Sequence, residues 1–298
     1  MPARSFSALS DRGVLEIAGT DRREFLQGLV SNDVTRVGDD RAVYAALLTA
    51  QGKYLHDFFI TEIDNFFLID AEAARLADLK RRLGLYKLRA NVTLTDVSDR
   101  YRISAAFGDE ALDLLDLPSD RGAVVEFGGG IAYVDPRLSE LGARLLLPRG
   151  IGTAPLEAAG FEVADEAAYD RLRLGLGVPD GSRDLTVEKS ILLESNFDEL
   201  NGVDWKKGCY IGQELTARTK YRALIKKRLI PVTVTGTLPA PGTPIMLGDQ
   251  EVGEVRSGRD SIALALLRLE VLSAASADMP LTAGGATLVP AKPGWAKY

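Results

Sequence analysis

The amino-acid sequence predicts an α+β protein that ends in a small all-β domain. Strand-like and helical segments alternate over residues 42–177, as in an antiparallel sheet covered by helices. A stretch without regular pattern follows over residues 180–208, and stretches of that length are usually functional or disordered. From Leu229 onward the helical pattern disappears, and short strands alternate with glycine and proline turns, as in a β-barrel or β-sandwich.

The α+β part opens with a helix predicted over residues 22–30, with Asp21 in the N-cap position. Two strands then flank a hairpin signal at residues 51–53. A second helix is predicted over residues 71–83, where Asp70 is the expected cap and leucines recur at helical spacing. The predicted strands of this part cover residues 42–50, 54–63, 65–70, 90–97, 101–107, 122–127, 131–135 and 143–148.

Two further helices are predicted before the C-terminal domain. A short one covers residues 111–117, and a longer one covers residues 166–177, with Asp165 as its cap and Gly177 at its end. The predicted strands of the C-terminal domain cover residues 229–236, 243–248, 251–258, 261–270 and 286–290.

Charge and composition exclude several classes of protein. Lys and Arg total 36 against 42 Asp and Glu, and the net charge of −6 argues against general binding to nucleic acid. No apolar run approaches the ~20 residues of a membrane helix, and the first residues lack the apolar core of a secretory signal. One cysteine and one histidine exclude an internal disulfide, a self-contained zinc or iron–sulfur site and a multi-histidine metal site. We therefore predict a cytoplasmic protein without membrane association.

The single cysteine, Cys209, stands in a segment suited to an anion. Lys206 and Lys207 precede it, and a helix is predicted to begin near Gly212. Lysines and a helix N-terminus favour a thiolate, and glycine lets backbone amides approach a ligand closely. The segment therefore fits a reactive thiolate or a bound carboxylate. The alternative is a buried, inert cysteine beside solvated lysines.

The motif KGCYIGQE over residues 207–214 resembles the signature of the YgfZ-type folate-binding proteins. These proteins are relatives of the glycine-cleavage T-protein, and the group includes a mitochondrial iron–sulfur assembly factor. The segments FLQGLVSND, YAALLTAQGK, YKLRANV and VGEVRS resemble further landmarks of the family, and they follow one another in order over residues 25–257. The resemblance therefore covers nearly the whole chain.

This resemblance implies a three-lobed, T-protein-like fold around a central channel that holds tetrahydrofolate, with a C-terminal β-barrel. Residues 1–46 and 165–228 would form the first folate-binding lobe. Residues 47–164 would form an α+β, ferredoxin-like lobe, and residues 229–298 the barrel.

The resemblance also implies ligands for the folate. Glu194 resembles the acid that pairs twice with the pterin ring, with Asn196 beside it; a solvated loop acid is the alternative. Arg222 and Lys227 belong to a basic run that suits the anionic tail of the folate, or that is simply a solvated face. The full set of folate-binding residues implied in this way is Asn32, Glu194, Asn196, Tyr210, Arg222 and Lys227.

The strand predicted over residues 54–63 departs from the T-protein pattern. The T-protein has two adjacent acids after its glycine turn. This chain retains the second acid as Asp57 and has His56 at the position of the first acid. Adjacent residues of a strand point to opposite faces, so one of the two can face a ligand. Asp57 is a candidate for folate contact and proton transfer, and His56 is predicted to be a hydrogen-bonded structural histidine.

Three functions are open at this point. The first is a tetrahydrofolate-binding accessory protein in iron–sulfur cluster assembly or repair, with Cys209 and Lys207 at its reactive centre. Because one cysteine cannot hold a cluster, iron–sulfur assembly proteins or client enzymes would have to supply further ligands. The second is an aminomethyltransferase of the T-protein type, which the missing acid disfavours. The third is a scaffold with a vestigial pocket, since a fold alone does not define a function.

Overall fold

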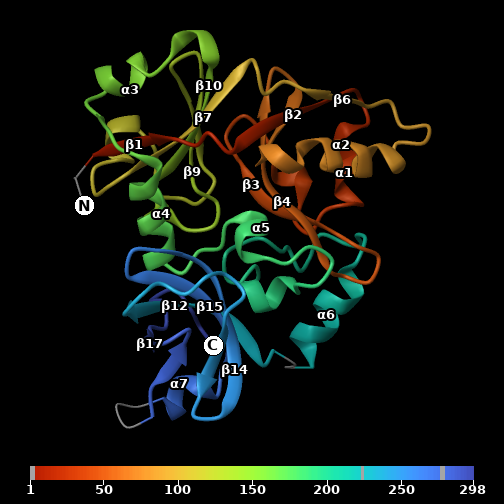
Figure 1. Cartoon of the computed structure of the whole chain (residues 1–298). Helices are drawn as coiled ribbons and strands as arrows, with labels where there is room; N and C mark the ends of the chain where they lie inside the picture. The colour runs from red at the N-terminus through yellow and green to blue at the C-terminus, as the bar shows by residue number, and fades with distance from the viewer. Residues whose placement is uncertain (1–3, 223–224, 276–278) are drawn as a thin grey trace. The chain divides into compact units, whose positions relative to one another are not determined.

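The computed structural model describes residues 4–222, 225–275 and 279–298, which form two compact units (Figure 1). The first unit contains the described residues up to Leu48, together with Leu55–Tyr169 and Asn201–Ile211. The second unit contains Thr49–Tyr54, Asp170–Leu200 and the described residues from Gly212 onward. Each unit is therefore assembled from segments that are far apart in the sequence. The division into three lobes stays a prediction.

One sheet of the first unit has five antiparallel strands in the order β3-β4-β5-β2-β6 (Figure 1). Helix α2 packs against β2 and β6 through its buried face, which carries Leu76, Leu79 and Leu83 at the helical spacing seen in the sequence. The elements are β2 (Arg12–Ala18), α1 (Arg22–Gln27), β3 (Val43–Leu48), β4 (Tyr54–Ile63), β5 (Phe66–Glu72), α2 (Leu76–Leu85) and β6 (Thr93–Asp96), with 3₁₀ helices η1 (Val34–Arg36) and η2 (Ala73–Arg75).

The other sheet of the first unit has six strands in the order β11-β1-β7-β10-β9-β8. An apolar cluster that includes Phe6, Leu145 and Phe161 forms its core. The elements are β1 (Ser5–Ala8), β7 (Tyr101–Phe107), η3 (Asp113–Leu115), β8 (Val124–Phe127), β9 (Gly130–Val134), η4 (Ser139–Leu141), β10 (Ala143–Pro148), η5 (Arg149–Ile151), α3 (Ala154–Ala158) and β11 (Glu162–Val163).

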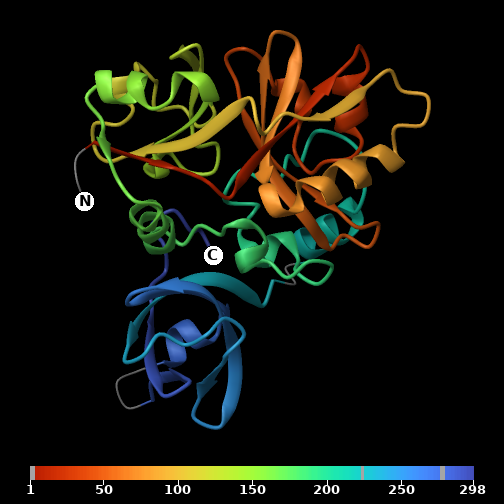
Figure 2. The same cartoon turned by 45° about the horizontal axis from the view of Figure 1, so that its top comes forward.

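The second unit contains a closed barrel of six strands, β12-β15-β14-β13-β16-β17, which forms a ring in Figure 2. Closure leaves no free edge, and side chains such as Ile230, Val255 and Leu267 fill the interior. The barrel contains β12 (Lys227–Thr235), β13 (Pro244–Leu247), β14 (Gln250–Arg259), β15 (Ile262–Arg268), α7 (Val271–Ala274), β16 (Leu281–Ala283) and β17 (Ala286–Pro290). Before it come α5 (Gly181–Asp184), η6 (Leu192–Ser195) and α6 (Gln213–Tyr221). Helix α4 (Glu166–Gly175) carries the chain from the first unit into the second.

Several local predictions are confirmed. The predicted order of strands and helices over much of the α+β part appears, and so does the barrel. The stretch predicted to be irregular over residues 180–208 contains two short helices, α5 and η6. Asp165 Oδ1 accepts a hydrogen bond from the amide of Ala168 at the start of α4. The turn at residues 51–53 also forms. Gly52 lies there at φ +78, and a Cβ atom on it would lie 2.6 Å from Cβ of Leu215 in α6. Only glycine fits this close approach.

The prediction that Asp70 caps a helix is wrong. Asp70 lies inside β5 and is buried between two arginines, Arg12 with its Nε at 2.6 Å and Arg144 with its Nη2 at 2.6 Å. A buried carboxylate needs charged partners, and these two arrive from β2 and β10. Strands β1 and β2 were not predicted from the sequence. Among the described residues, no helix is both long and apolar enough to span a bilayer.

Candidate functional site

Glu194 is a half-buried carboxylate in η6 of the second unit, and it has no hydrogen bond or direct ion pair with any described residue. Burial raises the pKa of its carboxyl group above the ordinary value, since water no longer solvates the charge fully. Neighbouring cations oppose this rise in the pKa. In order of their effect they are Lys227, Lys53, Arg256 and Arg228.

Two of these cations are open to a ligand. The ammonium groups of Lys53 and Lys227 have no hydrogen-bond partner among the described residues. Arg256 donates from Nη1 to Thr186 Oγ1 at 2.8 Å, but its buried Nε has no acceptor in the described part of the chain. A carboxylate next to unpaired cations suits a ligand that carries N–H donors at one end and negative charge at the other.

Asn196 fixes the loop that carries Glu194. Its backbone is left-handed, with φ +63, a conformation that asparagine tolerates better than most residues. The side chain is fully buried, donates to the carbonyl of Leu229 at 2.8 Å and accepts from Arg228 Nη1 at 3.2 Å. Arg228 in turn makes a two-bond ion pair with Asp198, at 2.6 and 3.0 Å. The amide of Asn196 is therefore bonded to protein groups and holds the site in position.

Lys207 is a structural cation of the first unit. Its ammonium group donates to three carbonyl oxygens, that of Gln27 at the end of α1 (2.8 Å) and those of Val30 (2.6 Å) and Asn32 (2.7 Å) in the loop that follows. A lysine has three N–H donors, so these bonds use all of them. Burial lowers the pKa of Lys207 to about 8, while the carboxylates of Asp33 and Asp204 favour its charged form.

Asn32 is also occupied by protein groups. Its amide nitrogen donates to the carbonyls of Tyr44 and Asn201, both at 2.7 Å, and its oxygen accepts from the amide of Asp33. Tyr210 is buried, and the ammonium nitrogen of Lys207 lies 5.3 Å from the centre of its ring. Asn32 thus connects the segment 201–211 to β3, and Tyr210 lies beside Lys207 within that segment.

Cys209 is exposed within this segment. Gly208 next to it is exposed and left-handed, with φ +94, and a Cβ atom added there would meet no atom within 4 Å. Three residues later Gly212, at φ +80, is the N-cap of α6. The helix start predicted from the sequence is therefore confirmed. Arg222 is exposed at the other end of α6.

Asp57 and His56 point to opposite faces of β4, as adjacent strand residues must. Asp57 Oδ2 accepts from the hydroxyl of buried Tyr44 at 2.8 Å, and burial and the Asp57 charge hold the pKa of that hydroxyl well above its usual value. His56 is buried on the other face, and its Nε2 lies 3.0 Å from Asp78 Oδ2 in α2. The prediction of a hydrogen-bonded structural histidine is confirmed.

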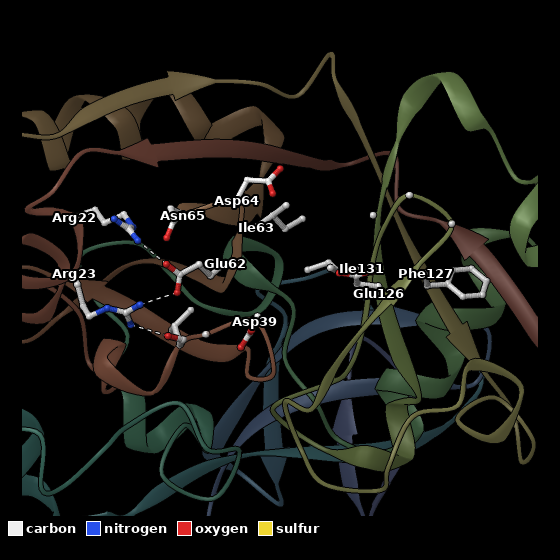
Figure 3. Close-up of a pocket in the computed structure, with 15 residues that line it drawn as sticks. Arg22, Arg23, Asp39, Glu62, Ile63, Asp64, Asn65, Glu126, Phe127 and Ile131 are labelled. Atoms are coloured by element: carbon white, nitrogen blue, oxygen red, sulfur yellow. Dashed lines mark hydrogen bonds and ion pairs between the residues drawn. The ribbon is translucent and has the colours of Figure 1, made fainter.

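A wide cleft of about 1030 Å³ in the first unit contains none of the residues singled out from the sequence (Figure 3). Its central carboxylate, Glu62, is paired with Arg22 at 2.6 Å and with Arg23 at 2.7 Å. The carboxylate of Glu62 is therefore already paired with protein cations, whereas the carboxylate of Glu194 has no such partner among the described residues. Among the described residues, no group of three or more His, Cys, Asp or Glu side chains is arranged to hold a metal ion.

The structure therefore brings Glu194, Asn196 and Lys227 together in the second unit, while Asn32, Asp57, Lys207, Cys209 and Tyr210 belong to the first. Sequence analysis missed Lys53 and Arg256. Lys53 follows Gly52 in the hairpin turn and Arg256 lies in β14, so no local pattern connected them with Glu194.

Two family models match the chain. One, described as the GCVT N-terminal domain, matches residues 7–124, and the other, described as the C-terminal β-barrel domain of CAF17, matches residues 226–298. The crystal structure of the glycine cleavage system aminomethyltransferase T from Bartonella henselae has the same fold, with a TM-score of 0.75 over 97% of this chain and 85% of that chain, at 16% sequence identity. The class is thus an α+β protein of the aminomethyltransferase T fold that ends in a β-barrel.

Curated relatives identify the family within this class. The mitochondrial iron–sulfur cluster assembly factor IBA57 of Mus musculus is 33% identical over 286 residues, which cover 89% of this chain and 77% of that protein. The Homo sapiens protein of the same name is 34% identical over 279 residues, 87% of this chain and 76% of its own length. An IBA57 homolog of Neurospora crassa is 32% identical over 246 residues, 79% of this chain and 55% of that protein. The chain belongs to the IBA57 family.

The relationship with T-protein-like proteins that was inferred from the sequence is confirmed, and so is the α+β fold with a C-terminal barrel. The prediction of a cytoplasmic location is wrong by the same comparison, because these relatives are mitochondrial proteins. It rested on the lack of a secretory signal and of a membrane helix, and neither feature distinguishes the cytoplasm from the interior of an organelle.

Proposed function

We propose that this protein acts in iron–sulfur cluster assembly or repair and binds tetrahydrofolate through Glu194. The assembly role rests on the relatives, which are iron–sulfur cluster assembly factors by name. The folate site rests on one observation, the half-buried carboxylate of Glu194, which has no bonded partner among the described residues and whose pKa is influenced by several cations.

The chemistry of the residues around Glu194 fits a reduced folate. The pterin ring carries neighbouring N–H donors that pair with both oxygens of a carboxylate, which is the role proposed for Glu194. The anionic glutamate tail requires cations, and Lys53, Lys227 and Nε of Arg256 are the candidates. Asn196 would hold the site in place, and Arg222 is a further candidate for the tail. When bound, tetrahydrofolate supplies a carrier for one-carbon units.

In the first unit, folate contact by Asn32 and Tyr210 stays a prediction from the family resemblance, because protein groups already bond the side chain of Asn32. Cys209 is the proposed reactive group. An exposed thiol on a segment fixed by Lys207 is accessible to a partner protein. Because a single thiolate cannot hold an iron–sulfur cluster, a partner from the assembly machinery or a client enzyme would supply the other ligands.

Tetrahydrofolate should raise the melting temperature of the wild-type protein, since a ligand that binds only the folded state stabilises it. Glu194→Gln keeps the shape of the side chain but removes an acceptor charge, and we expect it to weaken tetrahydrofolate binding about 10-fold or more in calorimetry, equivalent to ~1.5 kcal/mol or more. Glu188→Gln, a change of an exposed acid in the same unit, is the matched control. A wild-type protein that does not respond to saturating tetrahydrofolate would rule out the folate half of the proposal and leave the assembly half standing.

Aminomethyl transfer is the second candidate function. In its favour, Asp57 is retained, buried and hydrogen-bonded to Tyr44, which would fix its carboxylate for proton transfer. Against it, His56 occupies the place of the first acid of the T-protein pair and is bonded to Asp78. The similarity to the Bartonella henselae enzyme concerns the fold alone, so turnover has to be measured.

A further inference from the structure

Three apolar side chains are exposed where α2 ends. Leu85 is 65% exposed, Tyr86 44% and Leu88 89%. The buried leucines of α2 cover the sheet, so these three residues lie beyond the face that the fold requires. Exposed apolar side chains that gather in one place mark interaction surfaces more often than isolated ones do.

The backbone at Leu88 is held in an uncommon conformation. Its φ is +42, in the left-handed region that leucine rarely adopts. Hydrogen bonds on both sides stabilise the turn, from the amide of Lys87 to the carbonyl of Gly84 at 3.3 Å and from the amide of Ala90 to the carbonyl of Lys87 at 2.8 Å. The fold therefore maintains a strained turn whose side chain lies in solvent, and strain of this kind is concentrated at functional positions.

A cavity of about 410 Å³ lies beside this turn. Phe25, Leu29 and Tyr86 supply apolar walls, and Asp21, Glu24 and Arg89 supply charge. The projecting side chain of Leu88 and the partly apolar cavity lie next to each other. A partner that binds here must have a complementary shape, with an apolar group that enters the cavity.

The surroundings are strongly basic in a chain of negative net charge. Residues 76–91 contain five cations and one acid, a net charge of +4, against −6 for the whole chain. The acid, Asp78, is already paired with Arg81 and Arg82. Lys80, Lys87 and Arg89 have no ion-pair partner among the described residues, and all three are exposed. Charge complementarity thus requires an acidic partner.

We infer that Leu85–Arg89 and the adjoining cavity form a docking surface for an acidic protein segment that inserts an apolar side chain. The acidic groups steer the partner toward Lys80, Lys87 and Arg89, and the apolar contacts hold it. Asp21 and Glu24 line the cavity, so the acidic residues of the partner lie outside it, beside Lys80, Lys87 and Arg89, and only the apolar side chain enters. Nucleic acid fits less well, because it has no apolar side chain to insert. This inference goes beyond the folate binding proposed at Glu194, which belongs to the other unit.

The probe is a displayed library of random peptides, selected on the wild-type protein. We expect the enriched peptides to combine acidic residues with an apolar anchor. Leu88→Gly and Lys87→Glu should each weaken their binding about tenfold or more, and added salt should weaken it further. Glycine adopts a positive φ freely, so Leu88→Gly removes the side chain and keeps the turn. Val163→Ser and Lys189→Glu, which alter another exposed apolar residue and another exposed cation, should bind as the wild type does.

Other occupants are separate outcomes that overturn the inference. Enriched peptides without acidic residues, or peptides that bind both Leu88→Gly and Lys87→Glu normally, would exclude an acidic segment at this surface. Binding to vesicles of phosphatidylcholine with phosphatidylserine, lost in Leu88→Gly, would assign the surface to a membrane. A concentration-dependent dimer in sedimentation, lost in Leu88→Gly, would assign it to a second copy of the chain.

Discussion

Lys207 and Gln27 are joined by hydrogen bonds in both directions, although 180 residues separate them in the sequence. The ammonium of Lys207 donates to the carbonyl of Gln27 at 2.8 Å, and Nε2 of Gln27 donates to the carbonyl of Lys207 at 3.3 Å. The C-terminal end of a helix carries partial negative charge and unbonded carbonyls, so a cation is favourable there. The lysine of the KGC motif thus ties the cysteine segment to α1.

Replacing Lys207 should destabilise the protein. In Lys207→Met three carbonyls lose their donor, and we expect the free energy of unfolding in urea to fall by about 1–3 kcal/mol. Lys206→Met is the control, because Lys206 is exposed and its substitution should change stability by less than about 0.5 kcal/mol. Equal effects of the two substitutions would contradict a structural role for Lys207.

Cys209 should react readily with alkylating reagents in the folded protein. The thiol is exposed, so the rate with iodoacetamide should approach that of the urea-unfolded chain. The chain has one cysteine, and mass spectrometry therefore reports this site alone. Cys209→Ser should leave the free energy of unfolding unchanged within about 0.5 kcal/mol and should lower the activity of iron–sulfur enzymes in cells that depend on this protein. Normal enzyme activity in such cells would show that the thiol has no role in cluster assembly.

The stability of the protein should fall as the pH decreases below 6.5. Burial lowers the pKa of His56 from 6.5 to about 4, because the charged ring is poorly solvated, so in this range the unfolded chain binds a proton that the folded chain does not. The stabilisation is fully present above pH 6.5 and is lost toward pH 4, and it amounts to about 3 kcal/mol. Urea unfolding of wild type and His56→Gln should show a shallower pH dependence in the variant. Because His56 is the only histidine, its NMR titration reports the folded pKa directly, and a midpoint near 6.5 would contradict the prediction.

Aminomethyl transfer should be absent or at background level. An assay with an aminomethylated lipoyl carrier and tetrahydrofolate measures ammonia release, and Asp57→Asn tests whether any release depends on this carboxylate. We expect no difference between the two proteins, since His56 replaces the first acid and is bonded to Asp78. Release that requires Asp57 would instead make the transferase the leading function.

Local patterns predicted the elements that depend on neighbouring residues. The leucines of α2, the glycine turn at residues 51–53, the cap of α4 and the barrel strands all follow from spacing within short segments. Asp70 shows where this fails. Its local sequence is that of a helix cap, and its actual partners, Arg12 and Arg144, lie 58 and 74 residues away.

The surroundings of Glu194 show the same limit at the candidate site. Family resemblance singled out Glu194 itself. Lys53, however, lies in a hairpin turn far earlier in the chain and comes near Glu194 only in the folded protein. Likewise, the local sequence suggests that Lys207 activates the neighbouring cysteine, whereas in the structure its ammonium group donates to three carbonyls at the end of α1 and in the loop that follows. Charge partners set by tertiary contacts are not encoded in local spacing.

The barrel imposes an order on synthesis. Strand β12 pairs with β15 on one side and with β17 on the other, so residues 232–235 stay without their second neighbour until residues 287–290 have left the ribosome. During that interval the nascent chain presents an unpaired strand edge that other chains could join. A nascent chain on a ribosome stalled within this interval should therefore need a chaperone to prevent aggregation. Once β17 has left the ribosome, it pairs with β12, closes the barrel and removes the free strand edge.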